Sequence, residues 1–392
     1  MIGAVRRYFL LTGALSLGYG SIYTLLADLR DTYGFTEAQL GIITGAGFFA
    51  GFLAQVVLAR QADRGHTATM VRGGLLFAAI AMLSCALATQ LWAFIAGRVL
   101  LGLGSGMAGP ALRRLVILRE PDKVGANLGV QMSWDLTGFV LGPTLAAVLA
   151  EAGGLRTPFL VFGLLFVALL VQTANLDLRA EADVPVDAVD TGLLRNRSIL
   201  ATLVASIAFY VTIGVFESVW SVLLRDHGAE TWLIGLTLSL FTVPMIFLAP
   251  IGGRLAQRRG PLRTVALSIS LATLCTFSYG AFDVLWVLLV VSLVHAMADS
   301  FTMPGNQVAV AIAAPRHRLA AAQGLLGATG LATAGIVGLG AGAVYEHAGA
   351  FVLFSGTAAL MALCLAIALV LGRELLAPPV VAGPEPLPVE PF

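Results

Sequence analysis

Long apolar stretches recur along almost the whole chain, and they limit the possible folds more than any other feature. Hydrophobic residues make up 58% of the 392 residues and charged residues only 11%, whereas a soluble domain is about one-quarter charged. A soluble fold of this length could not bury so much apolar surface. A membrane-spanning helix needs about 20 apolar residues, so the chain has room for about twelve such helices joined by short loops.

The apolar stretches therefore predict an all-α integral membrane protein with twelve transmembrane helices. The first stretch follows Arg6 and Arg7, but it is too long for a signal peptide and has no clear small-residue cleavage site. We interpret it as the first span. The predicted spans are residues 8–28, 37–59, 70–89, 91–112, 125–149, 157–174, 199–224, 231–252, 264–281, 284–311, 320–344 and 349–371.

Two polar segments divide the chain into parts. Residues 175–197 carry acidic residues and a proline, and we interpret them as a cytoplasmic linker between a first bundle, residues 1–174, and a second, residues 198–372. Residues 373–392 contain six prolines and predict a disordered tail.

The basic residues sort to one side of the predicted membrane. With both termini inside, the inner segments hold 19 of the 23 Lys and Arg residues, and the outer loops hold only Arg30, Arg156 and Arg225. Inner loops of membrane proteins carry this excess. The pattern predicts a multi-pass protein of the cell membrane with both termini in the cytoplasm.

The two halves repeat at a nearly constant offset. Trp92 recurs as Trp286 and Pro110 as Pro304, both 194 residues later, and Leu29-Arg30-Asp31 recurs as Leu224-Arg225-Asp226. Such a repeat indicates duplication of a six-helix unit, with a substrate path where the two units meet.

The loop after the second span has a recognisable pattern. It reads Ala-Arg-Gln-Ala-Asp-Arg-Gly-His over residues 59–66, and residues 253–261 read Gly-Arg-Leu-Ala-Gln-Arg-Arg-Gly-Pro. Both resemble the Gly-x-Leu-Ala-Asp-Arg-x-Gly-Arg loop of the major facilitator superfamily. The resemblance implies two pseudo-symmetric six-helix bundles and a latch on the inner side; the alternative is a basic turn that only orients the protein. The implied gating residues are Asp63, Arg64, Gln257 and Arg258.

Two further patterns resemble this family. Arg98 opens an Arg-x-x-Leu-Gly-x-Gly sequence in the fourth span, similar to a pattern implicated in proton transfer, although the arginine could also extend to the outer surface. The fifth span resembles the glycine-rich pattern of antiporters, with two alanines replacing its last two glycines. Ordinary helix packing is the alternative interpretation. The residues of this second pattern are Gly129, Gly138, Gly142 and Pro143.

Ionisable side chains inside predicted spans are the candidates for proton coupling and substrate binding, because such residues are costly in a membrane. Each could instead make only a structural hydrogen bond between helices. His295 and Asp299 are four residues apart and should be adjacent on one helix. The five candidates are Arg98, Asp135, Glu217, His295 and Asp299, and Arg98 on the neighbouring helix is a candidate partner for Asp135. The expected cavity-lining residues are Tyr19, Tyr23, Tyr210, Trp220 and Asn306.

These features predict a secondary transporter that resembles drug:proton antiporters and exports small organic or amphipathic compounds by alternating access. A proton-coupled importer of a metabolite is the alternative, and a receptor or enzyme is a more remote one. The loops contain no phosphate-binding or nucleophile pattern, and the three cysteines are far apart in apolar runs. We therefore expect no enzymatic activity, cofactor or metal. The net charge of +1 gives no indication of a nucleic-acid partner, and we expect a monomer whose partners are substrate, protons and lipid.

Overall fold

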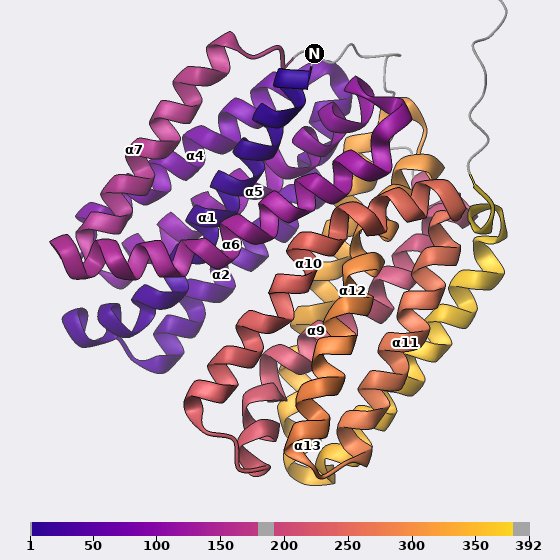
Figure 1. The fold of residues 1–392 in the computed structure, drawn as a ribbon. Helices are drawn as coiled ribbons and strands as arrows, with labels where there is room; N and C mark the ends of the chain where they lie inside the picture. The colour runs from indigo at the N-terminus through magenta and orange to yellow at the C-terminus, as the bar shows by residue number, and fades with distance from the viewer. Residues whose placement is uncertain (1, 179–191, 379–392) are drawn as a thin grey trace, which may run out of the picture.

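The computed structural model describes residues 2–178 and 192–378, in which the regular elements are helices and no strand occurs. The first half of the chain forms the indigo-to-magenta group in Figure 1. Its helices are α1 (Ile2–Tyr33), α2 (Glu37–Val57), α3 (Ala59–Gln61), α4 (Thr67–Leu87), α5 (Leu91–Arg119), α6 (Val124–Gly153) and α7 (Arg156–Gln172).

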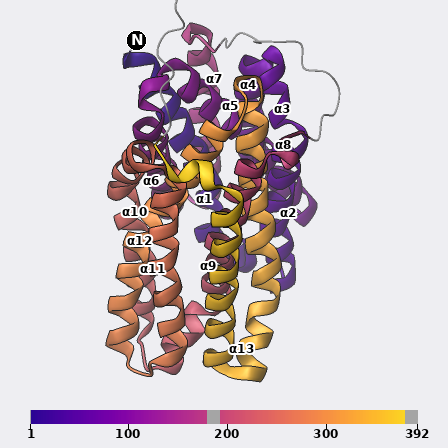
Figure 2. The ribbon, with the colours of Figure 1, turned by 90° about the vertical axis from the view of Figure 1, so that its right-hand side faces the viewer.

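The second half forms the rose-to-yellow group (Figures 1 and 2). Most of the predicted linker lies outside the described residues, and its last part forms the short helix α8. Residues 373–376, which we assigned to the tail, form a helical turn that buries Leu375, and residues 379–392 lie outside the described residues. The helices are α8 (Gly192–Arg195), α9 (Arg197–Asp226), α10 (Thr231–Arg259), α11 (Pro261–Ala281), α12 (Leu285–Ala313) and α13 (Leu319–Leu371).

Glycines in the left-handed region mark the turns, and they repeat with the sequence. Positive φ is readily adopted only by glycine. The two halves place these glycines 194 or 195 residues apart, which extends the duplication from sequence to backbone geometry. The pairs are Gly34 with Gly228, Gly65 with Gly260, and Gly154 with Gly349.

The exterior of the helices is apolar. Within the described ranges, nine helices are long and apolar enough to cross a membrane, and two of these contain a positive-φ glycine, Gly65 or Gly349. Large apolar side chains such as Phe49, Phe247 and Leu339 are 64%, 72% and 89% exposed. A bilayer is the solvent that accepts such a surface, so the protein is a multi-pass membrane protein.

The two groups of helices lie closest at one end of the molecule. We call this the terminal end, because α1 begins there and α13 ends there, and the ribbons diverge towards the opposite, far end (Figure 1). At the terminal end α6 packs directly on α10: a Cβ atom on Gly129 would lie 2.6 Å from Cα of Pro250. This arrangement places the closest packing between the halves on one side of the membrane.

Candidate functional site

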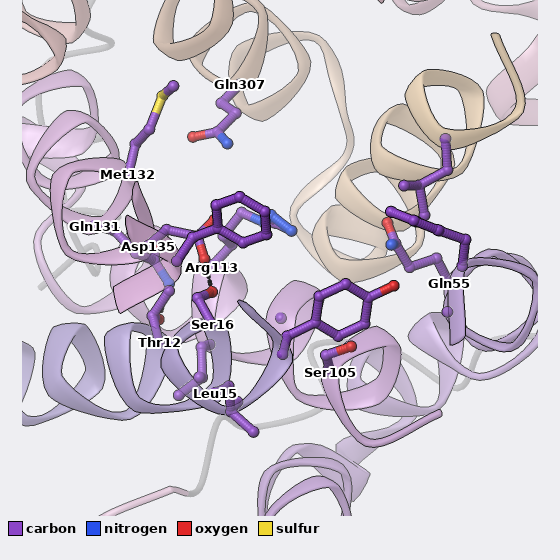
Figure 3. Close-up of a pocket in the computed structure, with 17 residues that line it drawn as sticks. Thr12, Leu15, Ser16, Gln55, Ser105, Arg113, Gln131, Met132, Asp135 and Gln307 are labelled. Atoms are coloured by element: carbon purple, nitrogen blue, oxygen red, sulfur yellow. Dashed lines mark hydrogen bonds between the residues drawn. The ribbon is translucent and has the colours of Figure 1, made fainter. Parts of the chain in front are cut away.

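A cavity of about 200 Å³ lies between the two halves. Most of its lining comes from α1, α2, α5 and α6, and Gln307 of α12 and Leu331 of α13 complete it from the second half. Figure 3 shows polar groups converging from several helices on this space. The polar and charged lining residues are Thr12, Ser16, Tyr19, Gln55, Ser105, Arg113, Gln131, Asp135 and Gln307.

Asp135 is the acidic group of this cavity. Its carboxylate accepts a hydrogen bond from the Ser16 hydroxyl on α1 (Figure 3). One turn earlier on α6, Gln131 donates to the Thr12 hydroxyl at 2.9 Å. These two bonds fix the polar face of α6 against α1, which leaves Asp135 directed into the space between the halves.

Arg113 is the cationic group of the cavity, and the sequence prediction missed it. The fourth span was expected to end at residue 112, but α5 continues to Arg119, so Arg113 stays on the helix and faces the cavity. It is close enough to Asp135 for mutual electrostatic attraction. The spacing of Ser105, Gly109 and Arg113, four residues apart on one helix face, is the signal that could have identified it.

Arg98, the candidate partner of Asp135, interacts elsewhere. It is 1% exposed, its guanidinium lies 4.5 Å from the centre of the Tyr19 ring, and it donates to the Tyr19 carbonyl oxygen at 3.2 Å. The Tyr23 ring is 5.7 Å away. Cation–π stacking of this kind stabilises a buried arginine in apolar surroundings. Arg98 therefore joins α5 to α1, beside the cavity that Tyr19 helps to line.

His295 and Asp299 are adjacent, as their spacing predicts, but they lie inside the second half. The His295 ring nitrogen is 3.5 Å from the Asp299 carboxylate, and the two side chains are 0% and 2% exposed. Tyr279 of α11 is hydrogen bonded to the other ring nitrogen at 3.1 Å. The rings of Phe216 and Phe241 pack edge-on against the imidazole. The pair thus belongs to an aromatic core, not to the lining of the cavity at Asp135.

The remaining predicted residues divide between surface and core. Glu217 is exposed and close enough to Tyr19 and Tyr23 for electrostatic interaction across the two halves. Trp220 is buried, donates to the Thr237 hydroxyl at 3.1 Å and stacks on Phe216. Of the five expected lining residues, Tyr19 is the one that contributes to this cavity. The other four, Tyr23, Tyr210, Trp220 and Asn306, are not part of its lining.

Asp63 joins the halves at the terminal end. Its carboxylate accepts the backbone N–H groups of Ala320 and Ala321, at 2.9 and 2.7 Å, where α13 begins. Arg114 forms an ion pair with it at 3.0 Å, and both side chains are almost fully buried. The first turn of a helix has unpaired N–H groups that favour a negative charge. Arg64 is the next residue and lies in the turn where Gly65 adopts a positive φ.

Gln257 makes the corresponding contact from the second half. Its amide accepts the Gly125 N–H at 2.7 Å and donates to the Asp122 carbonyl oxygen at 3.0 Å. Gly125 and Gly253 bring the backbones of α6 and α10 together beside it. Arg258 is exposed and lines a second, larger cavity at this end. Both copies of the loop therefore contribute hydrogen bonds between the halves.

The glycines of the fifth span have two different neighbours. Gly138 and Gly142 pack against the backbone of α1, at Gly13 and Leu17, whereas Gly129 packs against α10. Pro143 follows within the same helix. Among the described residues, no group of three or more His, Cys, Asp or Glu side chains could hold a metal ion.

Known proteins resemble the chain in sequence. A sequence model of the Major Facilitator Superfamily matches it twice, over residues 8–216 and 199–391. Multidrug resistance protein MdtG of Salmonella typhimurium is 24% identical over 278 residues, which cover 68% of this chain and 69% of the relative. MdtG of Salmonella paratyphi A matches over the same shares at the same identity.

Solved structures share the fold. The human organic anion transporter MFSD10 (TETRAN) aligns with a TM-score of 0.80 at 19% identity, covering 93% of this chain and 98% of that one. FucP, a Major Facilitator Superfamily transporter in the outward conformation, aligns with a TM-score of 0.73 at 17% identity over 94% and 98%. With both halves matched by the family and the whole fold shared, the chain belongs to the major facilitator superfamily and is a transporter, not an enzyme.

Proposed function

We propose that this transporter exports small organic or amphipathic compounds in exchange for protons, and that Asp135 carries the proton. The observation that supports this most is the position of Asp135: it is the acid that faces the cavity between the halves. Asp299, by contrast, is enclosed with His295 among aromatic rings of the second half. A proton carrier must exchange with water on each side in turn, and a cavity between rocking halves allows that exchange.

Exchange of substrate for protons follows if a proton and a cationic substrate compete for the same carboxylate. A protonated Asp135 has no charge to attract a cation, and an ionised Asp135 does. The walls of the cavity include Phe48, Phe139 and Met132, which offer apolar and polarisable contacts. At about 200 Å³ the cavity is below the roughly 300–1,000 Å³ of typical small-molecule sites. We infer that it holds the polar group of the substrate while the rest extends towards the far end.

The twelve predicted spans are part of this proposal. The breaks at Gly65 and Gly349 divide two of the long apolar helices, and α10 supplies a further helix of 29 residues. With the positive-inside rule the terminal end is cytoplasmic. The bonds made by Asp63 and Gln257 then close the inner side, so the structure corresponds to an outward-facing state.

Arg113 supports a second candidate, proton-coupled uptake of an organic anion. When Asp135 is protonated, Arg113 loses its neighbouring negative charge and can bind an anion, so proton and substrate would move together. MFSD10, which is described as an organic anion transporter, is consistent with this candidate. The family relative described as a multidrug resistance protein favours export.

A reconstituted transport screen tests the main proposal. Purified protein in vesicles is offered chemically diverse cationic, neutral and anionic compounds, with an imposed pH gradient and again after an ionophore has collapsed it. We expect cationic amphipathic compounds to accumulate only with the gradient, in the direction opposite to proton flow. Accumulation that is unchanged without the gradient would rule out proton coupling.

A further inference from the structure

A second cavity, of about 1,120 Å³, lies between the halves at the terminal end. It is bounded by α1 and α6 of the first half and by the last turns of α10 from the second. Its volume is between five and six times that of the cavity at Asp135, and the transport mechanism proposed above does not use it.

The charged side chains that line this cavity lie at one end of it. Its lining has four cationic side chains, Arg6, Lys123, Arg254 and Arg258, and two acidic ones, Glu120 and Asp122. The acids are partly engaged, because Glu120 accepts a hydrogen bond from Asn127 at 3.1 Å and lies 3.8 Å from Lys123. All four cations come from the ends of helices, where the chain leaves the apolar region. The site therefore has an excess of positive charge at the level of lipid headgroups.

The lining becomes apolar with depth. Along α6 it passes from Lys123 through Ala126 and Val130 to Trp134, a rise of about 16 Å at 1.5 Å per residue. On the α1 side it continues from Arg6 to Phe9 and Leu10. Leu10 and Trp134 are 48% and 40% exposed, so the apolar part opens on the bilayer. A cationic rim above an apolar slot of this length matches the headgroup and upper acyl chain of a phospholipid.

We propose that this cavity binds one anionic phospholipid of the inner leaflet, with its phosphate between Arg6 and Arg254 and its acyl chain along Val130 and Trp134. Basic pockets between transmembrane helices on the cytoplasmic side suit such headgroups. Because Arg6 and Arg254 belong to different halves, the lipid bridges them and stabilises the arrangement in which the terminal end is closed. Lipid binding does not depend on transport, so its test is independent of the proposed function.

Quenching of Trp134 fluorescence tests this site. The protein is reconstituted in phosphatidylcholine vesicles that contain a small, equal fraction of either brominated phosphatidylglycerol or brominated phosphatidylcholine. The part of the signal due to Trp134 is obtained by subtracting a Trp134→Phe variant. We expect brominated phosphatidylglycerol to quench Trp134 several-fold more strongly than brominated phosphatidylcholine at the same fraction.

Two charge variants separate this cavity from general attraction to a basic surface. Arg6→Gln with Arg254→Gln removes one cation from each half, and we expect it to reduce the preference for phosphatidylglycerol roughly 10- to 30-fold. Arg195→Gln with Arg197→Gln removes two exposed cations outside the cavity and should leave the preference intact. Gel filtration shows whether each variant is folded.

Three results would overturn the proposal. The first is equal quenching by the two brominated lipids in the wild-type protein. The second is an unchanged preference in the Arg6→Gln, Arg254→Gln variant. The third is a preference that arises only after residues 379–392 are deleted. Because Pro378 lines the cavity, that result would mean that the chain itself, not a lipid, occupies the cavity in the full-length protein.

Discussion

At the scale of single residues, the proposed transport mechanism depends on one carboxyl group, that of Asp135. Asp135→Asn keeps the size of the side chain and an acceptor for the Ser16 hydroxyl, but it cannot take up a proton. We predict that this variant no longer accumulates substrate against a gradient in vesicles, while downhill equilibration of the same substrate continues.

The control for this variant is Glu151→Gln, because Glu151 is an exposed acid at the far end of the same helix. It should accumulate substrate as the wild type does. Wild-type accumulation by Asp135→Asn, or an equal loss in Glu151→Gln, would remove Asp135 from the mechanism.

The sequence could identify ionisable residues within the membrane but not their partners. The i,i+4 spacing of His295 and Asp299 correctly predicted that they are adjacent, since helix geometry alone determines it. Which cation lies near Asp135 is determined by where α5 ends and by how α5 is rotated against α6. Neither can be read from the spacing of residues in the sequence. The predicted fourth span consequently ended before Arg113, and the prediction took Arg98 as the candidate partner of Asp135.

At the scale of helices, the glycines of α6 set the distance to α1. A Cβ atom at Gly138 would overlap the carbonyl oxygen of Gly13, whereas Gly356 of α13 has open space around it. We predict that Gly138→Ala lowers the stability by about 1–3 kcal/mol through overpacking. Gly356→Ala should be neutral or slightly stabilising, because alanine is the better helix former.

Thermal unfolding in detergent measures this difference. Cys85, Cys275 and Cys364 are buried, so a thiol-reactive fluorescent dye reports unfolding without further labelling. Equal unfolding temperatures for Gly138→Ala and the wild type would contradict the close packing of α1 on α6.

Helix positions follow from apolar length, and several predicted spans therefore agree closely with helices of the structure. The boundaries of α2, α4 and α11 lie within about three residues of the predicted ones, since turn residues end them directly. The predicted ends of α5 and α10 came seven residues early, because each helix continues as a charged extension beyond the apolar stretch. Hydrophobicity gives no signal for such an extension.

At the scale of the whole molecule, Asp63 connects the two halves through a buried network. Asp63→Asn replaces one of the two acceptor oxygens with an amide group, so one backbone N–H of α13 loses its acceptor, and it removes the charge that attracts Arg114. An unsatisfied buried group costs about 1–3 kcal/mol. We predict that the ratio of closed to open molecules at the terminal end falls about tenfold or more.

Distances between spin labels at Gln172 and Arg263, on the two halves at the terminal end, measure this shift. Asp177→Asn is the matched control, because the 2.5 Å pair of Asp177 with Arg119 is partly exposed and joins the start of the linker to the first half, not one half to the other. Identical distance distributions for Asp63→Asn and the wild type would show that the contact does not hold the halves together.

The central claim is that substrate leaves as protons enter through one cavity between the halves. The most direct test starts from a substrate gradient across vesicles with equal pH on both sides, and a dye in the lumen reports proton movement. We predict that wild-type protein moves protons in the direction opposite to the substrate and that Asp135→Asn does not. Proton movement in the same direction as the substrate, or substrate movement with no change of pH, would contradict the account.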